Sequence, residues 1–196
     1  MSRPLLLASA SPRRAELLRQ LGVVFEQQPA DIDERQLSGE SAEDYVARLA
    51  WEKSAAVQQG DPEVVVLAAD TCVVLDDQVL GKPEDEFDAL AMLARLGGRE
   101  HRVLTAVCVR QDQRVEEALS DTRVRFCTLT HEQCLAYIAT GEPWDKAGAY
   151  GIQGVAGAFV DSLEGSYSGV VGLPLAETWE LLRRVGVPTT LESAGS

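Results

Sequence analysis

Apolar residues in this chain form short continuous runs, which alternate with longer segments of helical periodicity. Uninterrupted runs such as residues 64–69 are typical of strands that are buried on both faces. Two alternating segments around a polar turn at 111–113 predict a β-hairpin. The strands predicted from these patterns span residues 5–8, 23–25, 64–69, 72–75, 101–110, 114–127 and 158–162.

The periodic segments carry the residues that start and stop helices. Ser11 with Pro12, Ser41 with Asp44, and Thr130 are N-terminal signals, and glycines follow at the other ends. Predicted helices lie between residues 11 and 22, 41 and 60, 84 and 96, 130 and 141, and 174 and 186, with loops at 29–39 and 165–172. Strands that alternate with helices, plus one hairpin, predict an α/β fold with a mixed sheet.

Length and composition are those of an ordinary globular protein with one core. The chain has 196 residues, of which 45% are hydrophobic and 25% charged. We predict a single domain over residues 1–188 and a frayed tail over 189–196. The absence of an export signal or an apolar span, together with cysteines that have no metal-ligand spacing, predicts a reduced, cytoplasmic protein. Cys72, Cys108 and Cys127 are predicted to be buried thiols, and His101 and His131 to lie at the surface.

The net charge of −13 argues against nucleic acid and anionic membranes as partners. A small phosphorylated ligand needs only a local positive pocket, and the start of the chain offers one. After the run 5–8, Ser11 and Pro12 open a helix whose first turn carries Arg13 and Arg14. The free N–H groups of a helix N-terminus and two guanidinium groups together favour an anion. This segment is therefore a candidate phosphate site.

A second candidate is Asp70, which follows the apolar run 64–69. In α/β sheets ligands bind beyond the ends of strands, although an aspartate there can also simply cap a turn. Lys53, Lys82 and Glu34 stand in other segments, and each alone is more often a solvated surface charge. Taken together, these cations would neutralise phosphate oxygens, while the carboxylates would hold a divalent metal or deprotonate a water.

The order and spacing of these residues resemble the Maf-like nucleoside triphosphate pyrophosphatases. The segments that carry the likeness are residues 7–14, Ala50 with 52–53, 69–71, 81–83, 145–154 and 170–174. The resemblance implies an elongated single α/β domain, with a central mixed sheet flanked by helices and a cleft between two lobes. It also implies a cytoplasmic homodimer that hydrolyses a nucleoside triphosphate to the monophosphate and pyrophosphate.

The resemblance assigns roles residue by residue. Asp70 matches the proton acceptor, and Arg13, Thr71 and Gln153 match base-choice positions. The residues that match the triphosphate and metal pocket are Ser9, Arg13, Arg14, Glu34, Lys53 and Lys82. As carboxylates, Glu34 and Asp70 can also ligate the metal, Mg²⁺ or Mn²⁺. Whether Asp70 acts as base, as metal ligand or as both is left open. The sequence of 145–154 resembles the branch that prefers dTTP and UTP rather than 7-methyl-GTP. Gly169 departs from the asparagine that many relatives carry, so we assign no role to residues 166–172.

Three other functions are weaker interpretations. A module that binds nucleotides without turnover has no need of a carboxylate at Asp70, and this chain has one. A nucleic-acid binder is disfavoured because no basic stripe offsets the charge of −13. A dinucleotide-binding fold is disfavoured because no G-x-G-x-x-G follows the first strand.

Overall fold

The computed structural model describes residues 4–58 and 61–192. Its strands are β1 (Leu5–Leu7), β2 (Glu26–Gln27), β3 (Val65–Leu75), β4 (Gln78–Leu80), β5 (Glu100–Gln111), β6 (Arg114–Phe126) and β7 (Val160–Glu164). The α-helices are α1 (Pro12–Gln20), α2 (Ala42–Val57), α3 (Glu86–Leu96), α4 (His131–Ile138), α5 (Tyr167–Val171) and α6 (Leu175–Arg184), and the 3₁₀ turns are η1 (Glu142–Asp145), η2 (Ala147–Ala149) and η3 (Val155–Phe159).

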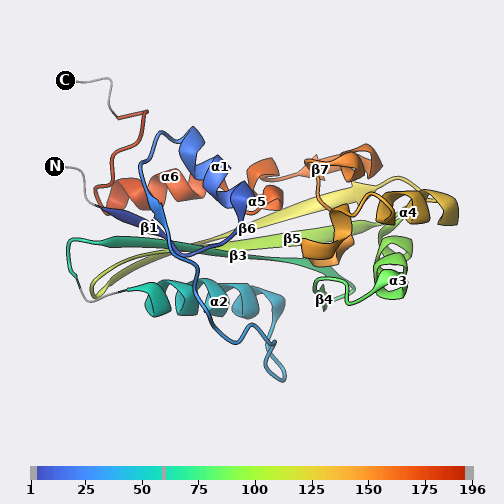
Figure 1. Cartoon of the computed structure of the whole chain (residues 1–196), viewed down its shortest axis with the longest axis horizontal. Coiled ribbons are helices and arrows are strands. Elements are labelled where there is room, and N and C mark those ends of the chain that lie inside the picture. Colours follow the sequence, from blue (N-terminus) through green and yellow to red (C-terminus); the bar gives the residue numbers. More distant parts are fainter. Residues whose placement is uncertain (1–3, 59–60, 193–196) are drawn as a thin grey trace.

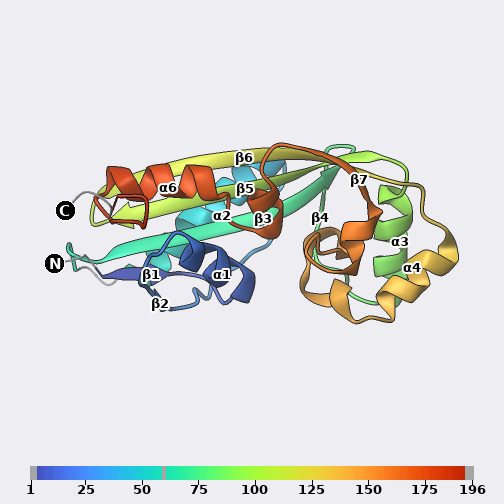
Figure 2. The ribbon, with the colours of Figure 1, turned by 90° about the horizontal axis from the view of Figure 1, so that it is seen from above.

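One mixed sheet runs the length of the molecule in the order β2-β1-β3-β5-β6-β7, with β4 also paired to β3. The β1 strand is parallel to both β2 and β3, and the other pairs are antiparallel. The α2 helix covers one face, while α1 and α6 cover the other (Figure 1). Seen from above, α3, α4 and the 3₁₀ turns form a second lobe at the far end of the long strands (Figure 2). The predicted α/β fold with a mixed sheet and two lobes is confirmed.

The two edges of β3 differ, and this difference creates the opening between the lobes. Along one edge β3 pairs with β5 from Val66 to Val74. Along the other edge it pairs with β1 up to Leu67 and with β4 only from Val73 onward. Among the described residues, 68–72 therefore have no neighbouring strand on that side. Asp70 and Thr71 lie at the middle of this open edge.

The sequence patterns placed most elements well, with informative exceptions. The break predicted between residues 64–69 and 72–75 is wrong, because β3 continues through Asp70 and only its edge partner changes. The strand predicted at 23–25 forms at Glu26–Gln27 instead, where β1 supplies the pairing. The predicted loop 165–172 contains α5, which Ser166 caps by accepting the Gly169 N–H. The helix predicted from residue 84 begins after Asp85, its N-cap.

Two predictions of exposure also need correction, those for His101 and Cys127. His101 is only 3% exposed, because its ring packs edge-on against Phe126 and lies 2.7 Å from the Tyr150 hydroxyl. Cys127 is exposed, whereas Cys72 and Cys108 are buried as predicted. Thr189, in the tail predicted to be frayed, is buried and hydrogen-bonded to Glu192, while residues 193–196 lie outside the described part of the chain.

None of the helices in the described ranges combines the length and apolar character needed to cross a bilayer.

Candidate functional site

A cavity of about 740 Å³ opens at the unpaired edge of β3, between the two lobes. It is the place where the site residues predicted from the sequence meet. All nine of them line it: Ser9, Arg13, Arg14, Glu34, Lys53, Asp70, Thr71, Lys82 and Gln153. They come from both faces of the sheet and from both lobes, so residues separated by more than a hundred positions line the same cavity.

The first wall is the N-terminus of α1. Ser11 caps the helix by accepting the Arg14 N–H at 3.4 Å, and Pro12 occupies the first turn, as the sequence predicts. The buried Ser9 hydroxyl accepts hydrogen bonds from the Ser11 N–H at 3.2 Å and from Arg14 Nη1 at 3.3 Å. The local capping signal therefore places a serine and two arginines at the cavity.

Arg14 is largely engaged by the protein itself. Its Nε donates to the Gly172 carbonyl at 2.8 Å, and its Nη2 donates to the Thr71 hydroxyl at 3.2 Å. Burial lowers the pKa of the guanidinium, and the charge of Asp70 acts in the opposite direction. Arg14 thus ties α1 to the α5 segment and keeps only part of its donor set for a ligand.

The hydrogen bonds of Arg14 continue through two threonines. The Thr71 and Thr105 hydroxyls are 2.9 Å apart, and Thr105 donates to the Gly169 carbonyl at 2.8 Å. Because that bond uses the single Thr105 proton, Thr71 is the donor between the two hydroxyls. Thr71, which the sequence predicts as a base-choice position, is therefore hydrogen-bonded to a buried residue that sequence reasoning missed. Thr105 sits directly opposite Thr71 in the β3–β5 register, a relation that no local pattern reveals.

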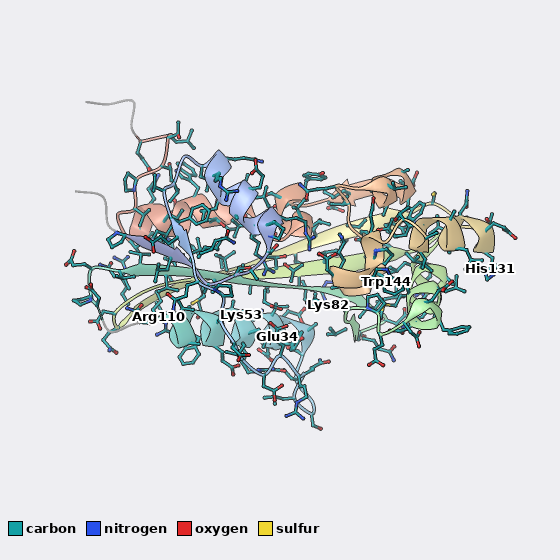
Figure 3. All side chains as sticks on the ribbon, viewed as in Figure 1. Glu34, Lys53, Lys82, Arg110, His131 and Trp144 are labelled. Carbon is teal, nitrogen blue, oxygen red and sulfur yellow. The ribbon has the colours of Figure 1, made fainter. Side chains whose placement is uncertain are left out.

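The second wall is an ionic cluster on the α2 face of the sheet. Lys53 Nζ lies 2.6 Å from Asp70 Oδ1 and 2.7 Å from Glu34 Oε1. Figure 3 shows Glu34 and Lys53 near the middle of the molecule, below β3. Lys53 and Asp70 are both buried, at 7% exposure each. Because one cation serves two carboxylates, the cluster retains a negative charge.

Burial by itself would raise the pKa of Glu34. The hydrogen bond and charge of Lys53, with further help from Lys82 and Arg14, outweigh burial and lower the pKa of this carboxyl. Glu34 is therefore held as a carboxylate at neutral pH. An ionised carboxylate beside Asp70 is a suitable ligand for a hard divalent cation.

The third wall carries the cations at the mouth of the cavity. Arg13 Nη1 lies 2.9 Å from Asp145 Oδ2, so α1 in one lobe contacts η1 in the other. Lys82 follows β4 and is exposed, and it forms no hydrogen bond or ion pair within the described part of the chain. Figure 3 shows it on the same side of the sheet as Lys53. Arg13 and Lys82 are the most accessible cations in the cavity, whereas Lys53 is buried.

Gln153 lies on a turn that closes the cavity from the second lobe. The Gly154 N–H donates to the Gly151 carbonyl at 3.1 Å, which makes residues 151–154 a β-turn with Gln153 in its third position. Gln153 is exposed, and its amide forms no hydrogen bond to any described residue. It is thus available to a ligand.

No group of three or more His, Cys, Asp or Glu side chains among the described residues is arranged to hold a metal ion. Glu34 and Asp70 are therefore a two-carboxylate set, held together by Lys53.

Comparisons with known proteins identify the family of this chain. The family described as "Maf-like protein" matches residues 4–185. A "dTTP/UTP pyrophosphatase" of Anaeromyxobacter dehalogenans (strain 2CP-1 / ATCC BAA-258) is 56% identical over 98% of this chain and 99% of its own. A "dTTP/UTP pyrophosphatase" of Methylobacillus flagellatus is 54% identical over 92% of each chain.

A solved structure titled for the Staphylococcus aureus Ham1 protein is 10% identical, with a TM-score of 0.45 over 63% of this chain and 72% of that one. A likeness this weak supports no conclusion. The family match, in contrast, covers almost the whole described chain, and the two relatives are matched over 92% and 99% of their own length. On that evidence the chain belongs to the Maf-like protein family.

Proposed function

We propose that this protein is a nucleoside triphosphate pyrophosphatase that hydrolyses dTTP and UTP to the monophosphate and pyrophosphate. The observation that carries the proposal is the cavity itself, in which Lys53 joins Asp70 and Glu34 while Arg13 and Lys82 stand at the mouth. An acidic protein that gathers cations in one place is suited to a polyphosphate. The names of the relatives supply the substrate class.

In the reaction, water attacks the α-phosphorus, a new P–O bond forms, and the bond from the α-phosphorus to the bridging oxygen breaks. Asp70 is suited to accept the proton of the water, because Lys53 fixes one of its oxygens and the other has no partner among the described residues. A positioned base of this kind contributes about 10²–10⁴ in rate. Arg13 and Lys82 offset the charge that grows on the leaving pyrophosphate.

Glu34 and Asp70 fit a magnesium or manganese ion, because such ions are often held by one or two carboxylates while substrate phosphates and waters complete the shell. Bound there, the cation would polarise the phosphate oxygens and stabilise the leaving group. Lys53 keeps the two carboxylates together in the absence of that ion.

We assign base choice to Gln153, Arg13 and Thr71. The amide of Gln153 can accept from the N3–H of thymine or uracil and donate to a neighbouring carbonyl. Cytosine presents an acceptor at N3 and an amino group beside it, so the amide pairs with cytosine only when its oxygen and nitrogen exchange places. The proposed preference for thymine and uracil therefore rests on the names of the relatives. The cytoplasmic location and the homodimer implied by the resemblance stay predictions; sedimentation measures the second.

The test is a panel of dTTP, UTP, dCTP, GTP and 7-methyl-GTP, with pyrophosphate release measured with and without Mg²⁺. We expect dTTP and UTP to be the best substrates, and chelation of the metal to abolish turnover until Mg²⁺ or Mn²⁺ is restored. Equal rates on 7-methyl-GTP would overturn the substrate assignment. Tight binding of dTTP without pyrophosphate release would instead indicate a nucleotide-binding module.

A further inference from the structure

The turn that carries Gln153 is held at both ends by side chains to which no role has been assigned. On one side the Val155 N–H donates to both carboxylate oxygens of Glu142, each at 3.1 Å. On the other side the Gly151 N–H donates to the hydroxyl of the buried Tyr137 at 3.2 Å. Burial raises the pKa of Tyr137 to about 12, so this hydroxyl stays neutral. Gln153 therefore stands on a segment with two fixed ends.

The glycines on either side of Gln153 make room for this arrangement. A Cβ at Gly154 would lie 2.2 Å from Glu142 Oε2, and a Cβ at Gly151 would lie 2.4 Å from Lys146 Cε. Neither glycine has a positive φ, so close approach, and not backbone conformation, accounts for both. The turn therefore packs closely against the side chains of Glu142 and Lys146.

Residues 142–146, which hold the turn, also contact Arg13. Lys146 Nζ donates to the Glu142 carbonyl at 2.7 Å and to Asp145 Oδ1 at 2.6 Å, and Asp145 Oδ2 accepts from Arg13 Nη1. Residues 142–146 thus contact Gln153 through its turn and Arg13 through an ion pair. Two of the three base-choice positions are connected through one segment.

We propose that Glu142 is a positioning residue for base recognition, which acts by holding the turn that presents Gln153 to the pyrimidine edge. This proposal rests on the proposed function. Discrimination by a hydrogen-bonding amide requires that the amide be held where its partners arrive, because ordering a mobile side chain on binding costs conformational entropy. A carboxylate that accepts the Val155 N–H with both oxygens supplies that order to the backbone of the turn.

The direct test compares dTTP with N3-methyl-dTTP, which lacks the N3–H that Gln153 would recognise. We expect Glu142→Ala to lower kcat/KM for dTTP by about tenfold, the worth of one hydrogen bond, chiefly through KM. The methylated substrate should lose little, so the preference between the two should shrink by the same factor. Glu142→Gln, which keeps one acceptor oxygen, should recover part of the preference.

Two further variants show whether Glu142 acts through Gln153. In a Gln153→Ala background, Glu142→Ala should have little additional effect, because the amide it holds is gone. Glu164→Ala, a change at an exposed residue of β7, is the matched control and should behave as wild type. Equal losses on both substrates, or a full effect in the Gln153→Ala background, would show a merely structural role and overturn the proposal.

Amide hydrogen exchange separates this proposal from the proposed function. Val155 should exchange faster in Glu142→Ala than in the wild type, whereas the core strand β5 should be unchanged. An unchanged Val155 rate overturns the positioning role whatever the activity. If the wild-type protein has no activity on dTTP, the proposed function and its substrate are wrong. This holds even if Val155 exchanges faster in Glu142→Ala.

Discussion

Asp70 and Thr71 are consecutive in the chain, but their side chains point to opposite faces of the sheet, as alternation in a strand requires. Asp70 meets Lys53 of α2 on one face, and Thr71 meets Arg14 of α1 on the other. Both are accessible from one cavity because the edge of β3 is unpaired there. Two adjacent residues of β3 therefore contact cations from the helices on opposite faces of the sheet.

At this scale the sharpest prediction concerns Asp70→Asn. The change keeps the size of the side chain but removes the carboxylate, so we expect kcat with dTTP to fall by about 10²–10⁴ while KM changes much less. Pyrophosphate release measures the loss, and nucleotide binding by calorimetry checks that substrate still binds. Asp161→Asn, at an exposed position of β7, is the control. A variant with near-normal turnover would remove Asp70 from the role of base.

Arg13 can be separated from structural arginines in the same way. Its ion pair with Asp145 is partly exposed, at 29% and 62% for the two side chains, and such pairs stabilise proteins by about 0–1 kcal/mol. We therefore expect Arg13→Ala to leave the melting temperature almost unchanged but to raise KM for dTTP at least tenfold or to alter base preference. Arg19→Ala on the same helix should do neither. A lowered melting temperature with unchanged kinetics would contradict this assignment.

At the scale of elements, Arg14, Thr71 and Thr105 connect α1, β3, β5 and α5 by one row of hydrogen bonds. The row begins at a helix whose cap and first turn are strong local signals, and it ends at the Gly169 carbonyl. It runs across the sheet beneath the cavity. Its members hold the elements that carry site residues in a fixed relation.

Thr105→Val tests that row. The substitution keeps the branched shape but leaves the buried Gly169 carbonyl without its donor, which costs about 1–3 kcal/mol of unfolding free energy. Urea denaturation measures the difference, and Thr128→Val at an exposed position is the matched control. Unchanged stability in Thr105→Val would indicate that the row contributes nothing.

At the scale of the whole molecule, three long strands carry both lobes, and each lobe has its own core. One core gathers β1, α1 and α6 with residues of β3 and β5, and the other gathers α3 and α4 around Phe126 and Tyr150. The cavity lies where the cores meet, so the stability of each lobe bears on the shape of the site. His101 stands in the second core, and it makes that core sensitive to pH.

Burial lowers the pKa of His101 to about 4 from its ordinary value of 6.5. Below pH 6.5 His101 binds a proton in the unfolded chain but stays neutral in the folded protein. The free energy of unfolding therefore falls as the pH drops toward 4. Between pH 7 and 5 this group should account for a loss of about 2 kcal/mol. Urea denaturation at both values should show a smaller loss in His101→Phe by that amount, and no such change in the exposed His131→Gln. Equal pH dependence in His101→Phe and the wild type would contradict the account.

The sequence by itself determined the features whose energy is local. Local signals include capping side chains, proline at a first turn and glycine after a helix. They act within four residues, so α1 and α4 were predictable. The hairpin of β5 and β6 was predictable from two alternating segments around a short polar turn. Six of the nine predicted site residues were singled out from the sequence pattern, and the family resemblance added Ser9, Thr71 and Gln153. Their gathering into one cavity agrees with it.

Only the tertiary structure decided the relations that join distant segments. Whether β3 is interrupted at Asp70 depends on which strands pair along its edge, and those strands lie elsewhere in the chain. Arg13 meets Asp145 across 132 positions, and Thr105 meets Thr71 through strand register. From the sequence His101 is predicted at the surface, but in the structure its ring packs against Phe126 and Tyr150. Such contacts are set by packing, which local sequence patterns do not encode.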